Sequence, residues 1–213
     1  MNNQKVIIWD WNGTLLDDVN ISVDAINAML IKRKLKPLTI EEYRQVFSFP
    51  VIEYYKRIGF NLENENWDEV STTFINEYQK RLPQCKLTQD AEIILKHYKH
   101  KGYKQIIISA MHQPALEQSI HELGINHYFD FIGGADDHYA HGKTQKAVKW
   151  FSQFNYNPAN ITFVGDSIHD SEVATALGCE CILLSSGHMA KDRLLGTARP
   201  VIENILNLKN FIL

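Results

Sequence analysis

The sequence predicts an α/β fold in which a doubly wound, Rossmann-like parallel sheet carries an all-α insertion after its first strand. Three features predict it: short runs rich in Ile and Val, amphipathic stretches between these runs, and one long stretch where this alternation stops. Such apolar runs are typical of strands buried on both faces of a parallel sheet. Alternation of these runs with helical patterns is typical of a doubly wound sheet.

Five apolar runs are the predicted strands. They are Val6 to Trp9, Gln105 to Ser109, Phe129 to Ile132, Ile161 to Val164 and Cys181 to Leu184. Four amphipathic stretches are the predicted helices of the core. They are Ala91 to Lys101, Pro114 to Leu123, Thr144 to Phe154 and Ser171 to Leu177.

The segment between the first two strands has no convincing buried strand. Its helical patterns are Ile21 to Lys32, Ile40 to Phe47, Val51 to Ile58 and Trp67 to Arg81. We therefore predict a helical cap domain at residues 18–83 and an α/β core domain made of residues 1–17 and 84–213.

Length and composition exclude several classes of protein. A chain of 213 residues suits one domain with a sizeable insertion. A net charge of −3, with no long basic run, provides no footprint for nucleic acid. The polar amino terminus and the lack of an apolar run of about 18 residues predict neither a signal peptide nor a membrane helix. Three cysteines without a disulfide or zinc spacing favour a reducing compartment, so we expect a cytoplasmic protein of open oligomeric state.

Asp10 follows the first predicted strand, in the sequence Asp10-Trp11-Asn12-Gly13-Thr14. Ligands of open α/β sheets bind at the carboxyl ends of strands. Gly13 lacks a Cβ, which allows the backbone to turn sharply and approach a ligand closely. An aspartate in this place is also a common loop cap, so this motif alone leaves both interpretations open.

Two further polar side chains follow predicted strands. Ser109 ends the second strand, where its hydroxyl and the amide of Ala110 suit a phosphate oxygen, although a helix cap is the alternative. Lys143 precedes the predicted helix at 144–154, where an ammonium group would screen the repulsion between two anions. Lys146 is a nearby competitor, and most lysines are solvated surface charges.

The sharpest signal is Gly165-Asp166-Ser167-Ile168-His169-Asp170, directly after the fourth strand. It places two carboxylates four residues apart beside a strand end. Mg²⁺ prefers hard oxygen ligands, usually one or two carboxylates completed by phosphate and water. The pattern predicts that Asp166 binds the metal and that Asp170 positions it or its waters.

Taken together, these residues resemble a known family. Asp-x-x-Gly-Thr-Leu, a strand-end Ser, a Lys and Gly-Asp-Ser-x-x-Asp occur in the order of the four motifs of the haloacid dehalogenase superfamily, with Asp166 23 residues after Lys143. The helical insertion resembles, in place and length, the cap of the phosphoglycolate phosphatase and β-phosphoglucomutase branch. The resemblance covers the whole chain.

The resemblance implies a Mg²⁺-dependent phosphatase that acts on a small phosphorylated metabolite. Asp10 would be the nucleophile and form an aspartyl-phosphate, with Mg²⁺ held by Asp10, Asp166 and the backbone carbonyl of Asn12. Thr14 and Asp170 would support the site. The groups implied in holding the phosphate oxygens are Ser109, Lys143 and the backbone amides of Trp11, Asn12 and Ala110.

Asn12 departs from the family pattern, because family phosphatases usually carry an acid–base aspartate there. Such catalysis contributes about 10²- to 10⁴-fold. Three hypotheses remain: a phosphatase in which water, substrate or another residue supplies the proton; phosphonate cleavage or phosphoryl transfer on the same scaffold; and a non-catalytic phosphate binder. Candidate proton donors are Asp17, Asp18 and His112, and the candidate lysine for phosphonate cleavage is Lys56.

Specificity is expected to reside in the insertion, which can close over the strand ends. The segment from Phe47 to Val51 lies between two predicted helices, and its aromatic residues favour a small or apolar leaving group. Packing between cap and core is an equally good interpretation of this segment. His169 and His188 are interpreted as helix or loop residues rather than ligands.

Overall fold

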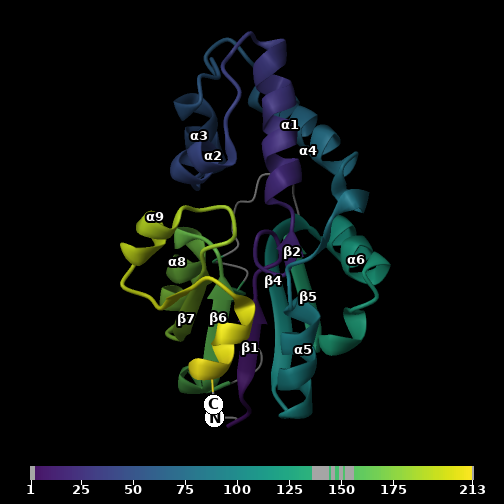
Figure 1. Cartoon of the computed structure of the whole chain (residues 1–213), viewed down its shortest axis with the longest axis vertical. Helices are drawn as coiled ribbons and strands as arrows, with labels where there is room; N and C mark the ends of the chain where they lie inside the picture. The colour runs from purple at the N-terminus through teal and green to yellow at the C-terminus, as the bar shows by residue number, and fades with distance from the viewer. Residues whose placement is uncertain (1–2, 136–143, 145–146, 149–150, 152–155, 213) are drawn as a thin grey trace.

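A six-stranded sheet forms the centre of the lower part of the molecule (Figure 1). The computed structural model describes residues 3–135, 144, 147–148, 151 and 156–212. The strand order is β5-β4-β1-β6-β7-β8, and every neighbouring pair is parallel. The strands are β1 (Val6–Trp9), β4 (Lys104–His112), β5 (Phe131–Ala135), β6 (Ile161–Gly165), β7 (Glu180–Leu184) and β8 (Val201–Ile202). This confirms the predicted fold class.

The predicted strands are present, but some of their ends differ. β4 continues past Ser109 to His112, so the prediction that this strand ends at Ser109 was wrong. β5 begins at Phe131 rather than at Phe129. The two-residue strand β8 was not predicted, because a pair of apolar residues has no detectable periodicity.

Helices cover both faces of the sheet because its strands are apolar on both. Ile7 and Trp9 of β1 belong to the cluster that includes α5 (Ala91–His100), α6 (Gln113–Glu122) and the 3-10 helix η4 (Ile205–Asn210). Val6 and Ile8 point to the other face, where α8 (Ile168–Leu177) and α9 (Lys191–Leu195) pack. Successive side chains of a strand point to opposite faces of the sheet, so neighbouring residues of β1 lie in two separate cores.

The predicted helix at residues 144–154 lies largely outside the described residues. Residues 144, 147, 148 and 151 are described and are helical. Ala147 and Phe151 are buried in the second of the two clusters. Lys143 and Lys146 lie outside the described residues.

Four helices pack over the carboxyl ends of the strands (Figure 1). They are α1 (Val19–Lys32), α2 (Ile40–Val46), α3 (Val51–Arg57) and α4 (Trp67–Gln79), close to their predicted positions. They share a cluster of their own, around Ile26, Met29, Tyr55 and Val70. The domain division at residues 18 and 83 stays a prediction.

A short antiparallel pair joins this helical layer to the sheet. Strands β2 (Leu16–Asp17) and β3 (Lys86–Leu87) pair where the chain leaves the sheet region and where it returns. Single turns of 3-10 helix complete the described chain: η1 (Leu82–Gln84), η2 (Asn126–Tyr128) and η3 (Pro158–Asn160). No described helix is long and apolar enough to cross a lipid bilayer.

The strand order changes direction at β1. The chain passes from β1 to β4 and β5 on one side, and then returns to β6 on the other side of β1. Open α/β sheets bind ligands at the carboxyl ends of strands where the order reverses in this way. That edge faces α1 to α4, whereas the two chain termini lie at the opposite end of the sheet (Figure 1).

Candidate active site

Asp10 and Asp166 lie at the carboxyl ends of neighbouring strands. Trp9 of β1 is opposite Val164 of β6, and the amide of Asp10 donates to the Val164 carbonyl oxygen at 2.8 Å. Asp166 directly follows β6. Both aspartates are buried, with 8% and 2% of their surface exposed. The sheet therefore brings together two carboxylates that are far apart in the sequence.

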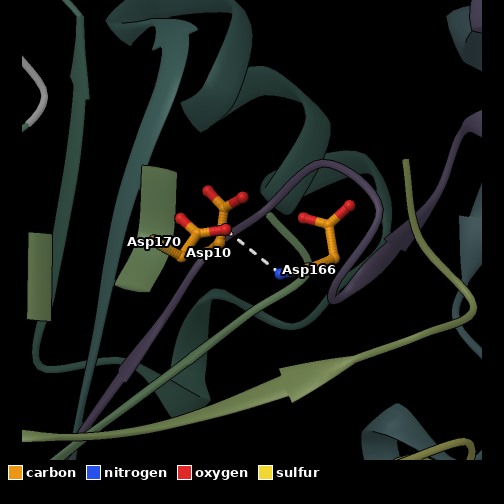
Figure 2. A group of neighbouring side chains, drawn as sticks. All are labelled: Asp10, Asp166 and Asp170. Carbon is orange, nitrogen blue, oxygen red and sulfur yellow. Dashed lines mark hydrogen bonds between the residues drawn. The ribbon is translucent and has the colours of Figure 1, made fainter. Parts of the chain in front are cut away.

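Asp170 is the third carboxylate of this group (Figure 2). One oxygen from each of Asp10, Asp166 and Asp170 lies within 4.8 Å of the others. Hard oxygen donors at this separation suit a divalent cation such as Mg²⁺, which takes one or two carboxylates from the protein. The donor set therefore fits the metal that the sequence motifs predict.

Asp170 organises the turn that holds Asp166. Its Oδ2 accepts hydrogen bonds from the amides of Asp166 and Ser167, at 3.1 and 3.0 Å, and from the Ser167 hydroxyl at 2.7 Å. Ser167 and Asp170 also form a capping box at the start of α8. These bonds hold the backbone of the turn on which Asp166 lies. The supporting role of Asp170 at a metal site stays a prediction.

The carboxylate of Asp166 is enclosed by backbone. The amide of His188 donates to Asp166 Oδ2 at 2.5 Å, and the Thr14 hydroxyl donates to Oδ1 at 3.4 Å. Gly13 has a φ of 71°, and a Cβ at Gly13 or Gly187 would overlap the Asp166 carboxylate. Glycine is therefore required at both positions for this close approach.

Ser109 and Ala110 lie on β4 beside Asn12. The Ser109 hydroxyl is 3.4 Å from Asn12 Oδ1, and its oxygen accepts a hydrogen bond from the Met111 amide at 3.0 Å. The following helix α6 begins at Gln113, so Ser109 is not its cap. The two residues predicted to bind phosphate therefore lie at the edge of the sheet where Asp10 is found.

Asn12 is bonded to a buried carboxylate. Its Nδ2 donates to Asp18 Oδ2 at 2.9 Å and to the Tyr78 hydroxyl at 2.8 Å. The Tyr78 hydroxyl donates to the same Asp18 oxygen at 2.7 Å, and the Gly13 amide donates to Asp18 Oδ1 at 2.7 Å. Because Asp18 is only 1% exposed, it depends on such donors. An amide at position 12 supplies one of them.

His188 is the cationic partner of Asp18. Its Nε2 lies 3.1 Å from Asp18 Oδ1, and a hydrogen bond of 2.9 Å joins its Nδ1 to the Tyr43 hydroxyl. Burial alone would lower the pKa of His188, but the nearby carboxylates, Asp18 first, raise this pKa to about 9. Burial alone would raise the pKa of Asp18, but the charge of His188 and the hydrogen bonds that Asp18 accepts hold it below its ordinary value.

Sequence patterns did not identify His188, Tyr43 or Tyr78 as site residues. His188 was interpreted as a loop residue, and the tyrosines have no local motif. They come from the loop after β7, from α2 and from α4, and only the folded chain brings them together. No signal in the sequence alone would have found this cluster.

Two arginines connect α2 to the chain around His188: Arg44 binds the loop that carries His188, and Arg193 of α9 binds the end of α2. Arg44 donates to the carbonyl oxygens of Ser186 and Gly187, at 2.5 and 2.8 Å. Arg193 donates to the carbonyl oxygens of Arg44 and Phe47, at 3.1 and 2.5 Å. The helical layer is therefore held down on the sheet at this point.

A cavity of about 200 Å³ lies between the helical layer and the strand ends. Asp10, Asn12, Ala110 and Asp166 line its lower part. Phe47, Phe49 and Val51 line its upper part, which is where the specificity segment was predicted. The segment thus contacts the cavity and also packs against the helical layer, since Phe47 belongs to that layer's cluster.

The remaining predicted residues do not all face this cavity. The Trp11 side chain is fully buried in the core below, so only its backbone is available to a ligand. Lys56 is half exposed, pairs with Glu53 at 2.8 Å and is not part of the cavity lining. The structure therefore does not support Lys56 as a Schiff-base lysine.

A family model described as haloacid dehalogenase-like hydrolase matches residues 7–184. The chain belongs to this family. A phosphoglycolate phosphatase from Neisseria gonorrhoeae is 24% identical over 97% of this chain and 95% of its own length. One from Pseudomonas fluorescens is 25% identical over 93% of this chain and 73% of its own length. These names agree with the predicted enzyme class, a phosphatase.

The haloacid dehalogenase-like fold is also found by comparison of structures. The protein tyrosine kinase A of Mycobacterium tuberculosis superposes with a TM-score of 0.81, at 19% identity and with 98% of each chain covered. At this identity the likeness concerns the fold alone. It confirms that the parallel core and the helical layer above it form a recurrent architecture.

We predict that Asn12→Asp lowers the free energy of unfolding by about 2 kcal/mol, because a second carboxylate then lies against Asp18 and a donor is lost. Asp18→Asn alone is also destabilising. The double variant Asn12→Asp/Asp18→Asn restores a donor and an acceptor, so it should be more stable than the sum of the single effects by about 1 to 3 kcal/mol. Urea unfolding of all four proteins measures this coupling.

Asp17→Asn is the matched control for this cycle. Asp17 is exposed, and its substitution by Asn removes the same charge at the position next to Asp18. The change in the free energy of unfolding should therefore stay within about 0.5 kcal/mol. Strictly additive effects of the two substitutions would show that Asn12 and Asp18 are not coupled.

Proposed function

We propose that the protein is a Mg²⁺-dependent phosphohydrolase that cleaves a small phosphomonoester through an aspartyl-phosphate on Asp10. The observation that carries this proposal is the convergence of Asp10 and Asp166 at the reversal point of the sheet, with oxygens within 4.8 Å. The names of the curated relatives support it. The likeness to phosphoglycolate phosphatases, at about a quarter identity, suggests a small substrate without identifying it.

In the first step, a carboxylate oxygen of Asp10 attacks phosphorus and the bond from phosphorus to the leaving oxygen breaks. The leaving alcohol takes up a proton. In the second step water displaces the Asp10 carboxylate, which releases inorganic phosphate and restores the enzyme. Covalent catalysis of this kind divides one difficult displacement into two easier ones.

Asp10, Asp166 and the backbone carbonyl of Asn12 would hold Mg²⁺, and Asp170 would fix Asp166 in place. When bound, the ion neutralises charge and orients the phosphoryl group. The Ser109 hydroxyl and the Ala110 amide would hold phosphoryl oxygens from the side of β4. Lys143 and the backbone amides of Trp11 and Asn12 are proposed for the same task.

The proton donor to the leaving group is not Asn12, because an amide does not titrate. Of the three candidates near it in sequence, Asp17 is exposed and does not line the cavity. Asp18 and His112 both line it. Asp18 has no proton to give, because the charge of His188 and the hydrogen bonds that Asp18 accepts hold its pKa below its ordinary value. We propose that the proton comes from His112, from water or from the substrate, which would allow the chain to work without the usual aspartate.

We also propose that α1 to α4 act as a cap domain at residues 18–83. The cavity lies between these helices and the catalytic edge, so a bound phosphoester would be covered from above. Exclusion of water strengthens the electrostatic interactions at the phosphoryl group. We expect the protein to act in the cytoplasm on a small metabolite, without nucleic acid or membrane partners.

We predict that Asp10→Asn lowers Mg²⁺-dependent phosphate release from phosphomonoesters by at least about a thousandfold, because the nucleophile is lost. Phosphate release is measured on a substrate panel with and without Mg²⁺. Acid-quenched wild-type samples should carry a phosphoryl group on Asp10 in peptide mass spectra.

Asp17→Asn, with the same change of charge, should keep wild-type rates. Equal phosphate release by Asp10→Asn and wild type would mean that Asp10 is not the nucleophile. Binding of phosphate without turnover in the wild type would favour the non-catalytic binder.

We predict that Mg²⁺ raises the unfolding temperature of the wild-type protein and that Asp166→Asn removes most of this increase. A ligand that binds only the folded state stabilises it by about 2.7 kcal/mol at a hundred times its dissociation constant. Thermal unfolding with and without Mg²⁺ measures the effect, and Asp17→Asn should respond to Mg²⁺ like the wild type. An equal Mg²⁺ response in Asp166→Asn and wild type would place the metal elsewhere.

A further inference from the structure

We infer that the leaving group is an uncharged, ring-sized alcohol, aromatic or alicyclic, rather than an alcohol that carries a carboxylate. This inference rests on the proposed phosphohydrolase function and names the substrate class of the same site. It differs from what the name of the curated relatives suggests, because phosphoglycolate carries a carboxylate next to its phosphate. The argument comes from the upper part of the cavity.

Aromatic and aliphatic side chains from the helical layer form the walls of this upper part. Lining residues of this kind are Phe47, Phe49, Val51, Tyr55, Trp67 and Phe74. They are packed against one another: the ring centroids of Phe47 and Phe49 are 5.5 Å apart, and those of Tyr55 and Trp67 are 5.3 Å apart. Packed rings offer apolar surface and few hydrogen-bonding groups to a ligand.

The described part of the lining offers no lysine or arginine to a carboxylate. Among the lining residues that the structure describes there is no Lys or Arg, and the ionisable groups other than tyrosine are three aspartates and two histidines. One of these histidines, His188, already pairs with Asp18 at 3.1 Å. A substrate carboxylate in the upper part of the cavity would therefore lie against apolar rings, at a high cost of desolvation.

Two arginines close to His188 in the fold, Arg44 and Arg193, have other partners. Arg44 donates to the backbone oxygens of Ser186 and Gly187, and Arg193 donates to those of Arg44 and Phe47. Neither arginine lines the cavity. A carboxylate could take either arginine as its partner only by breaking these bonds, which hold the helical layer on the sheet.

The size of the cavity agrees with a ring. The whole cavity, which includes the part next to Asp10 and Asp166, has a volume of about 200 Å³. An apolar cavity of about 150 Å³ in another protein holds one benzene molecule. A leaving group the size of glycolate would leave much of the aromatic wall without contact, and unfilled space forfeits dispersion energy.

A matched pair of substrates tests the inference on the wild-type protein. 4-Nitrobenzyl phosphate and 4-carboxybenzyl phosphate have nearly the same shape and leaving alcohols of similar acidity, but only the second has a charge on the ring. We expect kcat/KM to be at least about tenfold higher for the nitro compound, and higher for benzyl phosphate than for 2-phosphoglycolate. Equal values, or a preference for the carboxylates, would overturn the inference.

Ile75→Arg tests the same point by adding the missing cation. Ile75 lines the cavity but belongs to none of the buried clusters, so the change should not unfold the protein. We expect the ratio of kcat/KM for the nitro compound over the carboxylate to fall by at least about tenfold.

The control Ile31→Arg places the same charge on α1, at a residue that is 61% exposed and outside the lining, and should leave the ratio unchanged. Thermal unfolding verifies that both variants fold, and a ratio that Ile75→Arg leaves at the wild-type value would overturn the inference.

The outcomes separate this inference from the proposed function. Mg²⁺-dependent hydrolysis that favours the carboxylate substrates would keep the phosphohydrolase and reject the apolar leaving group. Absence of Mg²⁺-dependent hydrolysis of every phosphomonoester in the panel, and of the more reactive acyl phosphate acetyl phosphate, would reject the proposed function and the inference with it.

Discussion

The close approach of acidic side chains at one edge of the sheet is the constraint on which the site depends. Two unit charges 4 Å apart repel by about 4 kcal/mol at an effective dielectric constant of 20. Asp10 and Asp166 are nevertheless held together, because β1 and β6 are neighbours and each aspartate directly follows its strand. Backbone and hydroxyl donors fix Asp166 and Asp170 in this arrangement. A site that places carboxylates so closely suits a divalent cation, which would relieve the repulsion.

A second buried charge lies where the helical layer joins the sheet. Asp18 immediately precedes α1 and accepts hydrogen bonds from Asn12, Gly13 and Tyr78, while His188 supplies the opposite charge. From the sequence alone, Asn12 looks like the replacement of a catalytic aspartate. In the structure it is the amide that a neighbouring carboxylate requires, since an aspartate there would repel Asp18. The carboxylate near this part of the cavity is therefore at position 18 instead of position 12, and it is tied to Tyr78 of α4.

The sequence predicts those features of the fold and site that depend on local patterns, and it misses those that depend on contacts between residues far apart in the chain. Strands such as β1 are continuous apolar runs and helices such as α4 have periodic apolar patterns, so their positions could be predicted. The meeting of Asp10 and Asp166 could also be predicted, because the carboxyl ends of parallel strands share an edge of the sheet. The end of β4 could not be predicted, since Ser109 to His112 remain extended without an apolar pattern. The pairing of His188 with Asp18 joins residues 170 positions apart, and no local pattern encodes it.

The comparison of structures separates what the fold determines from what it leaves open. A protein named as a tyrosine kinase shares this architecture at a TM-score of 0.81, so the fold alone does not fix the substrate. The phosphate end of a substrate would meet carboxylates, a hydroxyl and backbone amides that are set by the sheet. The rest of the substrate would meet side chains from α2 to α4, such as Phe49, Trp67 and Ile75. Binding energy from remote parts of a substrate can be used to position its reacting centre. We therefore expect the aromatic wall above the site to decide selectivity, because no metal or nucleophile is required there and its side chains can match the leaving group.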